Sequence, residues 1–212
     1  MSSKIFPSAL LLFLLTTLNH ATWASSCDTS LNRSPWVIDH FKPSPQGQYR
    51  GDSVVKRHLT PEMLRLEKGS SSTISGDLDY TLRHIPNHPI ALDLASRLEL
   101  ALTITPERYP NERMVKSADC YFKTALNFTP SQPYVHYIYA IHFHRYKAYE
   151  QAAEAYKTAN RLGLNNAEFM YNYGLTLFEL ARYAEARQLA DSAKALNYPF
   201  EALDKKLMAK GF

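Results

Sequence analysis

The sequence predicts an all-α fold in which antiparallel pairs of helices stack into a helical-hairpin solenoid, with an irregular N-terminal arm before it and a C-terminal capping helix after it. Two observations predict this fold. From Asp77 onward, apolar residues recur at helical spacing between short loops containing Pro or Asn, and no stretch alternates as a strand would. The same part of the chain also repeats its pattern at an offset of 34 residues.

The first 26 residues have the layout of an export signal. Lys4 supplies a positive start, residues 9–15 are an unbroken apolar run, and small residues follow up to Ser26. The run is shorter than the roughly 20 apolar residues that cross a bilayer, so we expect residues 1–26 to be a cleaved signal peptide, removed after Ala24 or Ser26. The mature chain would then be periplasmic or secreted, with no integral membrane span.

The two cysteines of the chain are Cys27 and Cys120. An oxidising compartment favours a disulfide between them, which would clamp the arm onto the helical body. The alternative for Cys27 is a lipid anchor, because cleavage after Ser26 would make it the first residue. That alternative is less favoured, since bacterial lipoprotein signals usually carry Leu where this chain has Ala24.

The charge is only mildly basic, with 24 Lys and Arg against 20 Asp and Glu and a formal net charge of +4. These charges are scattered, without a block of one sign, so neither a nucleic-acid footprint nor a polybasic membrane patch is visible. We expect no nucleic-acid partner.

Residues 27–76 are rich in Ser, Pro and Gly and predict an extended arm with one short helix. Loop signals fill 43–52 and 68–77. The short helix begins with Thr60 as its cap and Pro61 at its first position, and Gly69 ends it.

Residues 77–212 form the predicted repeat domain. Its first repeat is irregular, with helices expected at 90–102 and 112–126 and an insertion between them. The expected units are a degenerate half-repeat at 79–89, an irregular repeat at about 89–130, regular repeats at about 132–165 and 166–199, and a cap helix at about 200–210.

Two stretches carry a recognisable motif: YNYGLTLFELARYAEARQLADSAKALNYP at 171–199 and YIYAIHFHRYKAYEQAAEAYKTANRLGL at 137–164. Both resemble the tetratricopeptide repeat, and the resemblance extends over roughly 77–212. With the segment GDLDYTLRHIPNHP before the repeats, the chain also resembles uncharacterised exported repeat proteins of Gram-negative bacteria. Small side chains let neighbouring helices approach closely, and they are expected at Ala118, Ala125, Ala140, Ala152, Ala159, Gly174, Ala186 and Ala193.

The resemblance implies a concave groove lined by the first helices of successive hairpins. At the positions that face such a groove stand Tyr134, Tyr137, Ile141, His144, Arg145, Tyr171, Asn172, Leu175, Phe178 and Glu179. Asn172 matches the groove asparagine that bonds a peptide backbone, and the aromatic rings suit a binding surface. The alternative is that some of these rings pack on the cap helix, on the arm or on a second copy of the chain.

Catalytic and metal-binding patterns are weak. His136, His142 and His144 have spacings that do not bring them to one helix face. Neither a Gly-x-Ser-x-Gly elbow nor a phosphate or dinucleotide loop is present. We therefore expect no catalytic residues, no metal and no cofactor. The favoured function is an exported scaffold that binds a peptide segment or helix of an envelope protein; a self-associating structural subunit is the alternative, and a hydrolase is less favoured.

Overall fold

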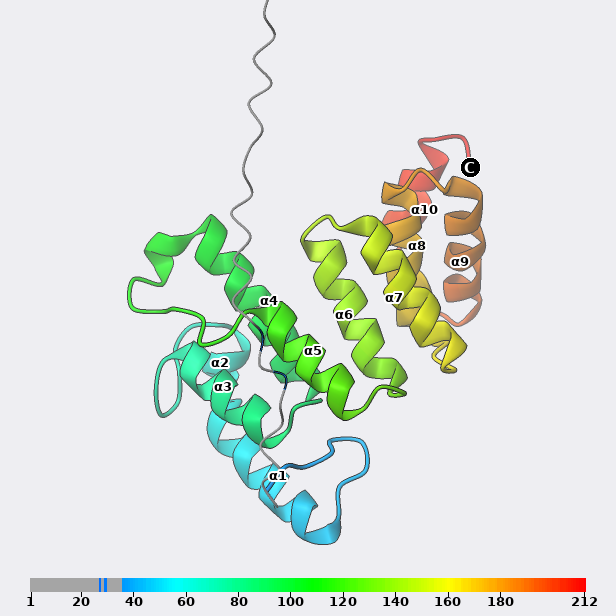
Figure 1. The fold of residues 1–212 in the computed structure, drawn as a ribbon. Coiled ribbons are helices and arrows are strands. Elements are labelled where there is room, and N and C mark those ends of the chain that lie inside the picture. Colours follow the sequence, from blue (N-terminus) through cyan, green and yellow to red (C-terminus); the bar gives the residue numbers. More distant parts are fainter. Residues whose placement is uncertain (1–26, 28, 30–35) are drawn as a thin grey trace, which may run out of the picture.

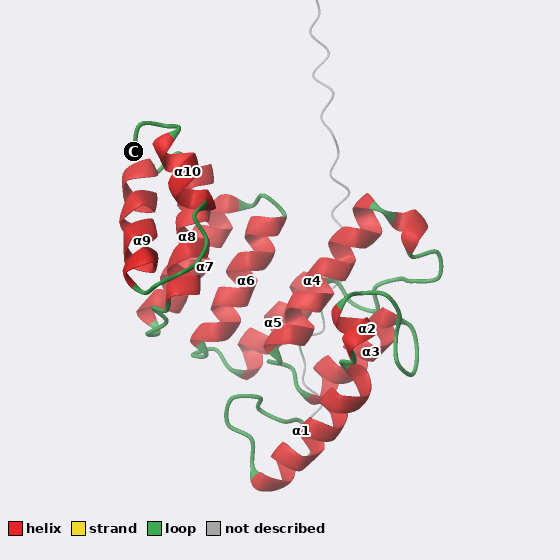
Figure 2. Cartoon of the chain, turned by 180° about the vertical axis from the view of Figure 1, so that it is seen from behind, coloured by secondary structure: helices red, strands yellow, loops and turns green. Residues whose placement is uncertain are grey.

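The computed structural model describes residues 27, 29 and 36–212, and the predicted signal peptide at 1–26 lies outside the described residues. Within the described part, the chain has ten α-helices and one short 3-10 helix, with no strand. The helices pack in pairs from α1 at one end of the molecule to α10 at the other (Figure 1; Figure 2). None of the helices in these residues has the length and apolar character needed to cross a membrane.

The arm contains more helix than the one short helix that we predicted. Helix α1 (Pro45–His58) occupies the stretch expected to be a loop. The Ser44 side chain accepts a hydrogen bond from the Gly47 N–H and caps the helix, and Pro45 stands at its start. Gly51 is buried there, and a Cβ on it would lie 3.8 Å from Ile38 and Ile85. The glycine therefore lies inside the helix, with room for a small side chain, and does not mark a turn.

The predicted short helix begins as expected but ends earlier. Helix α2 (Pro61–Leu64) starts behind Thr60, whose side chain accepts from the Met63 N–H. It stops before Gly69 because Leu66 adopts a left-handed conformation, with φ of 55°.

The next hairpin differs from the prediction at its second helix. Helix α3 (Ile74–His84) leads into α4 (Pro89–Ile104), a 3-10 turn (Pro106–Arg108) and α5 (Ala118–Phe128). We expected the last of these to begin at Glu112. Instead Ser117 caps it, and the Glu112 carboxylate accepts the N–H groups of Ile74 and Ser75 at 2.6 and 3.1 Å, capping α3.

The two regular hairpins and the cap lie close to their predicted positions. Helices α6 (Pro133–Arg145) and α7 (Tyr149–Arg161) form one pair, and α8 (Ala167–Glu179) and α9 (Tyr183–Ala195) form the next, followed by α10 (Ala202–Met208).

The backbone turns of these hairpins recur at the same offset as the sequence. The turns inside the two pairs have left-handed residues at Lys147 and Ala181, with φ of 59° and 56°. The turns that follow the pairs have them at Gly163 and Asn197. Both intervals are 34 residues, so the repeat seen in the side chains is also a repeat of backbone geometry.

The small residues predicted at helix crossings are buried. Gly174 is in the closest contact: a Cβ placed on it would lie 2.6 Å from Leu203 of α10 and 3.4 Å from the carbonyl oxygen of Ala186 in α9. The seven alanines of that set are each at most 1% exposed: Ala118, Ala125, Ala140, Ala152, Ala159, Ala186 and Ala193.

Aromatic pairs fill the space between successive helices. Phe122 stacks on Tyr139 with ring centroids 4.7 Å apart, and Tyr156 stacks on Tyr173 at 5.1 Å. Each partner of the second pair lies 34 positions after its counterpart in the first. The core is therefore built from the same contact used twice.

The arm is held on the body by a disulfide and by the turn between α3 and α4. Cys27 and Cys120 are bonded, with their Cα atoms 5.5 Å apart. The Ile38 N–H donates to the His84 carbonyl at 2.8 Å. Asn87 is fully buried; its oxygen accepts the His40 N–H at 3.0 Å and its amide donates to Asp39 at 2.8 Å. These hydrogen bonds give the segment GDLDYTLRHIPNHP a structural role, because it holds the arm against the helical body.

Candidate binding surfaces

The ten predicted groove residues come from α6 and α8, the first helices of the two regular hairpins. Their surroundings divide them into three groups: buried residues, residues held by partners inside the chain, and residues that remain partly open. The division decides which of them another molecule can reach.

Tyr137 belongs to the core and is 1% exposed. Its ring packs against Tyr156 and Phe169, with centroids 6.1 and 5.9 Å away. The Asn172 amide donates to the Tyr137 hydroxyl at 2.8 Å, and burial raises the pKa of this tyrosine. The prediction that Tyr137 faces a partner is corrected by this burial, and one donor of Asn172 is already in use.

Arg145 is part of a polar network between α4 and α6. Its guanidinium donates to Ser96 and pairs with Asp93, whose carboxylate oxygen is 2.6 Å away. The buried His142 ring shares a hydrogen bond of 2.9 Å with the same Ser96 hydroxyl. Burial lowers the pKa of His142 to about 4, with a further lowering by Arg145, so the ring is neutral near pH 7. The one basic residue predicted for the groove is therefore neutralised by Asp93.

Three other groove residues have partners within the chain, two of them with partners on the cap helix. The Lys206 ammonium lies 5.1 Å from the centre of the Phe178 ring and 2.9 Å from a carboxylate oxygen of Glu179. His144 shares a hydrogen bond of 2.8 Å with Thr176, and burial lowers its pKa. Packing on the cap helix, which was the alternative reading of the groove, thus accounts for part of this surface.

Three groove residues, Tyr134, Ile141 and Leu175, are half-buried and rest on the core. Tyr134 also meets the arm, since its ring centroid is 6.3 Å from that of Phe41. The middle of the predicted groove is therefore a shallow apolar surface.

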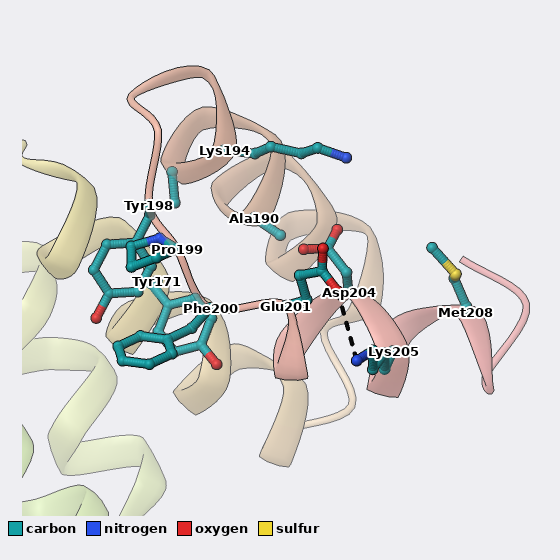
Figure 3. A pocket seen from close by; sticks show the side chains of 11 residues that line it. Tyr171, Ala190, Lys194, Tyr198, Pro199, Phe200, Glu201, Asp204, Lys205 and Met208 are labelled. Atoms are coloured by element: carbon teal, nitrogen blue, oxygen red, sulfur yellow. Dashed lines mark ion pairs between the residues drawn. The ribbon is translucent and has the colours of Figure 1, made fainter.

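A deeper pocket of about 400 Å³ begins at Tyr171 and extends between α9 and α10. Figure 3 shows Tyr171, Tyr198 and Phe200 at one end of this C-terminal pocket and Met208 at the other. The Tyr171 ring is 4.8 Å from Tyr198 and 6.2 Å from Phe200. Tyr171 is 8% exposed, whereas Phe200 is 60% exposed. The pocket thus has a buried aromatic wall and an open aromatic edge.

The rim of the C-terminal pocket carries both signs of charge. Lys194 and Lys205 contribute the positive groups, and Glu201 and Asp204 the negative ones. Lys205 and Glu201 are 3.5 Å apart, as the dashed line in Figure 3 marks. Asp204 is held by Arg187 of α9, which anchors the cap helix.

Tyr198 and Phe200 were not among the predicted groove residues because they follow the end of α9 at Ala195, whereas the predicted groove positions lie on the first helices of the hairpins. The sequence does carry a signal: the short stretch Asn197–Tyr198–Pro199–Phe200 places two aromatic residues in a loop, where binding residues are often found.

The histidines that were considered as metal ligands are separated. His136 bonds to the Pro130 carbonyl at 2.8 Å, while His142 and His144 bond to Ser96 and Thr176. Among the residues that the structure describes, no three His, Cys, Asp or Glu side chains are grouped in a way that could hold a metal ion.

No protein-family model matches the chain, and no curated protein matches it either. The functional interpretation therefore depends on the geometry of the surfaces described above.

Proposed function

We propose that the chain is a non-catalytic interaction scaffold of the tetratricopeptide type that is exported to the cell envelope. Its binding surface is the shallow apolar face of α6 and α8 together with the C-terminal pocket, and its partner is an apolar segment or helix of another envelope protein. The single observation that carries this proposal is the C-terminal pocket, in which Phe200 is 60% exposed beside the buried ring of Tyr171.

The exposure pattern supports a binding role for this end of the molecule. Leu196, Phe200 and Met208 are 52%, 60% and 67% exposed and all lie at or after the end of α9. Rings with one face packed and one face open lose little conformational freedom when a partner covers them, which is a property of binding hot spots.

The turn recurrence supports the assignment to the repeat type. Left-handed residues at Lys147 and Ala181, and again at Gly163 and Asn197, repeat with the 34-residue interval of the tetratricopeptide motif. The disulfide between Cys27 and Cys120 supports export, since disulfides persist in oxidising compartments.

The test is a pull-down from envelope extract with the mature chain and two matched variants. Phe200→Ser removes the open ring of the pocket, and Ile104→Ser removes an equally exposed apolar side chain, at 66%, at the far end of α4. A partner held by wild type and by Ile104→Ser, and lost with Phe200→Ser, supports the proposal. Equal retention by both variants would count against it.

Self-association through the same pocket is the second candidate. The specific observation in its favour is the mixed rim: under a two-fold axis, the lysines of one copy would meet the carboxylates of the other. Light scattering distinguishes the candidates, because a dimer that becomes a monomer in Phe200→Ser indicates self-association, whereas a wild-type monomer excludes a stable dimer.

A further inference from the structure

A second pocket, of about 300 Å³, lies at the opposite end of the molecule from the C-terminal pocket. It is enclosed by the part of the arm that precedes α1, by α1 itself and by the turn between α3 and α4, which lie together away from α10 in Figure 1. Its walls are apolar, with Ile38, Val55, Ile85 and Ile90 among the lining residues. This volume is at the small end of the range for ligand sites, roughly 300–1,000 Å³. We call it the arm pocket.

One polar side chain in the arm pocket has an unused donor. His88 is 2% exposed, and its Nδ1 accepts the N–H of Ala91 at 3.3 Å, capping α4. In a neutral imidazole the proton is then on Nε2. Nε2 has no hydrogen-bond partner among the described residues, although the ring lines the pocket. Among the described residues, Arg187 Nε is the one buried side-chain nitrogen or oxygen that lacks a partner, so the Nε2 of His88 is accessible from the pocket, where water or a ligand acceptor can take its hydrogen bond.

The imidazole stays neutral at ordinary pH. Burial lowers the pKa of His88 to about 4, and the neighbouring His40 lowers it further. The two rings are 4.6 Å apart, and burial also lowers the pKa of His40, against the pull of Asp39. At pH 7 the site therefore presents a hydrogen-bond donor without a positive charge.

The formal charge among the lining residues of the pocket is negative. Of the residues that line it, Asp52 alone carries a full charge at pH 7, and it accepts a hydrogen bond of 2.8 Å from Gln48. With one carboxylate and two neutral imidazoles among the lining residues, an anionic ligand gains no ion pair from the lining and meets a repulsive charge at Asp52, whereas Lys42 and Arg50 line the adjoining pocket.

We propose that the arm pocket binds a small, neutral, mostly apolar ligand that places one oxygen acceptor, such as a carbonyl, on the Nε2–H of His88. The apolar body lies against the isoleucines and Val55. This site is separate from the surface proposed for protein partners. Because Ile38 and His40 belong to the arm, a bound ligand would also stabilise the packing of the arm on the helical body.

Three probes of similar size test the proposal by ligand-observed NMR on the mature, disulfide-bonded chain: acetophenone, ethylbenzene and benzoate. Acetophenone has the acceptor, ethylbenzene lacks it and benzoate adds a negative charge. We expect acetophenone to bind about 2- to 10-fold more tightly than ethylbenzene, the factor that one net hydrogen bond provides, with benzoate weakest. Equal binding of acetophenone and ethylbenzene, tighter binding of benzoate, or no binding of any probe at millimolar concentration would overturn the proposal.

Two variants locate the binding. His88→Asn retains a residue that can cap α4 and removes the imidazole donor, so the preference for acetophenone should disappear. His84→Asn is the control, since His84 bonds to the Tyr80 carbonyl and does not line the pocket. Gly51→Ala provides a variant that should fold, because its Cβ meets only ordinary contacts of 3.8–3.9 Å; it narrows the pocket and should weaken acetophenone at least twofold. Unchanged acetophenone binding in a folded Gly51→Ala or His88→Asn would also overturn the assignment.

Discussion

The Cδ2 atom of Leu203 lies 2.6 Å from the point where a Cβ would stand on Gly174. A methyl group can occupy that point only if the Leu203 side chain changes its rotamer or the cap helix moves, so a residue without a side chain suits α8 where α10 crosses it. The same point is 3.4 Å from the Ala186 carbonyl oxygen in α9. Gly174 therefore lies where α8, α9 and α10 approach one another closely.

Replacing Gly174 by Leu should reduce the free energy of unfolding by roughly 1–3 kcal/mol or more, because the added side chain overpacks this crossing. Denaturant unfolding followed by circular dichroism measures the change. Gly51→Ala is the matched control and should be neutral or slightly stabilising, since its Cβ fits and alanine favours helix. Leu203→Ala should lower the free energy of unfolding by less in the Gly174→Leu background than in wild type, because it removes the side chain that the new leucine meets. Strictly additive losses of free energy would contradict the contact.

Removing the disulfide should release the arm. The double variant Cys27→Ser with Cys120→Ser should lose about 2–4 kcal/mol of stability, because the bond closes a long loop in the unfolded chain. Limited proteolysis should then cut the arm before the repeats. Wild-type protein treated with reductant should show the same loss of stability as the double variant. Two free cysteines found by thiol labelling of untreated protein would contradict the disulfide.

Asp77 should make the fold sensitive to strong acid. Burial of its carboxylate acts to raise the pKa, but hydrogen bonds from His58, Ser71 and the Ser70 N–H outweigh burial and lower the pKa to about 2. Since the folded pKa is below the unfolded one, the carboxylate stabilises the fold above about pH 4, and this stabilisation is lost as the pH falls through 2. The contribution is on the order of 2 kcal/mol. Unfolding measured from pH 5 to 2 should show a steeper loss in wild type than in Asp77→Asn; parallel curves would refute this role.

His142 should make the stability of the fold depend on pH in a less acidic range than Asp77 does. Its folded pKa of about 4 is below the ordinary value of 6.5, so the unfolded chain takes up a proton first as the pH falls. Stability present above pH 6.5 should therefore decline towards pH 4. His142→Phe should show a shallower decline over that range, with the remaining slope contributed by His40, His88 and His144, whose pKa values burial also lowers. An identical slope in the variant would show that His142 is not held neutral in the fold.

The repeated part of the chain could be predicted because one contact is used again at a fixed interval. The stack of Phe122 on Tyr139 returns as Tyr156 on Tyr173, and a pattern of this kind is visible in the sequence. Helix α1 could not be predicted in the same way. Its glycines look like loop signals, and only the structure shows that Ser44 caps a helix there and that Gly51 lies buried inside it beside Ile38 and Ile85.

The candidate site was less predictable than the fold. Motif positions indicate which side of a helix a residue is on, but not what covers that side. Tyr137 is covered by Phe169 of the next hairpin, and Glu179 is taken by Lys206 of the cap, a helix that has no counterpart in the motif. The exposed Phe200 lies outside the repeat pattern altogether.

The measurement that tests the proposed function most directly is site-specific photocrosslinking in cells, with the photoreactive residue at Met208 on the edge of the C-terminal pocket. The matched position is Ile104, which is 66% exposed against 67% for Met208 and lies far from the pocket. An interaction scaffold predicts one discrete adduct from position 208, with a mass other than twice that of the chain, that is absent from position 104 and absent when Phe200→Ser is added. The same adducts from both positions, or an adduct from 208 that persists with Phe200→Ser, would contradict the account.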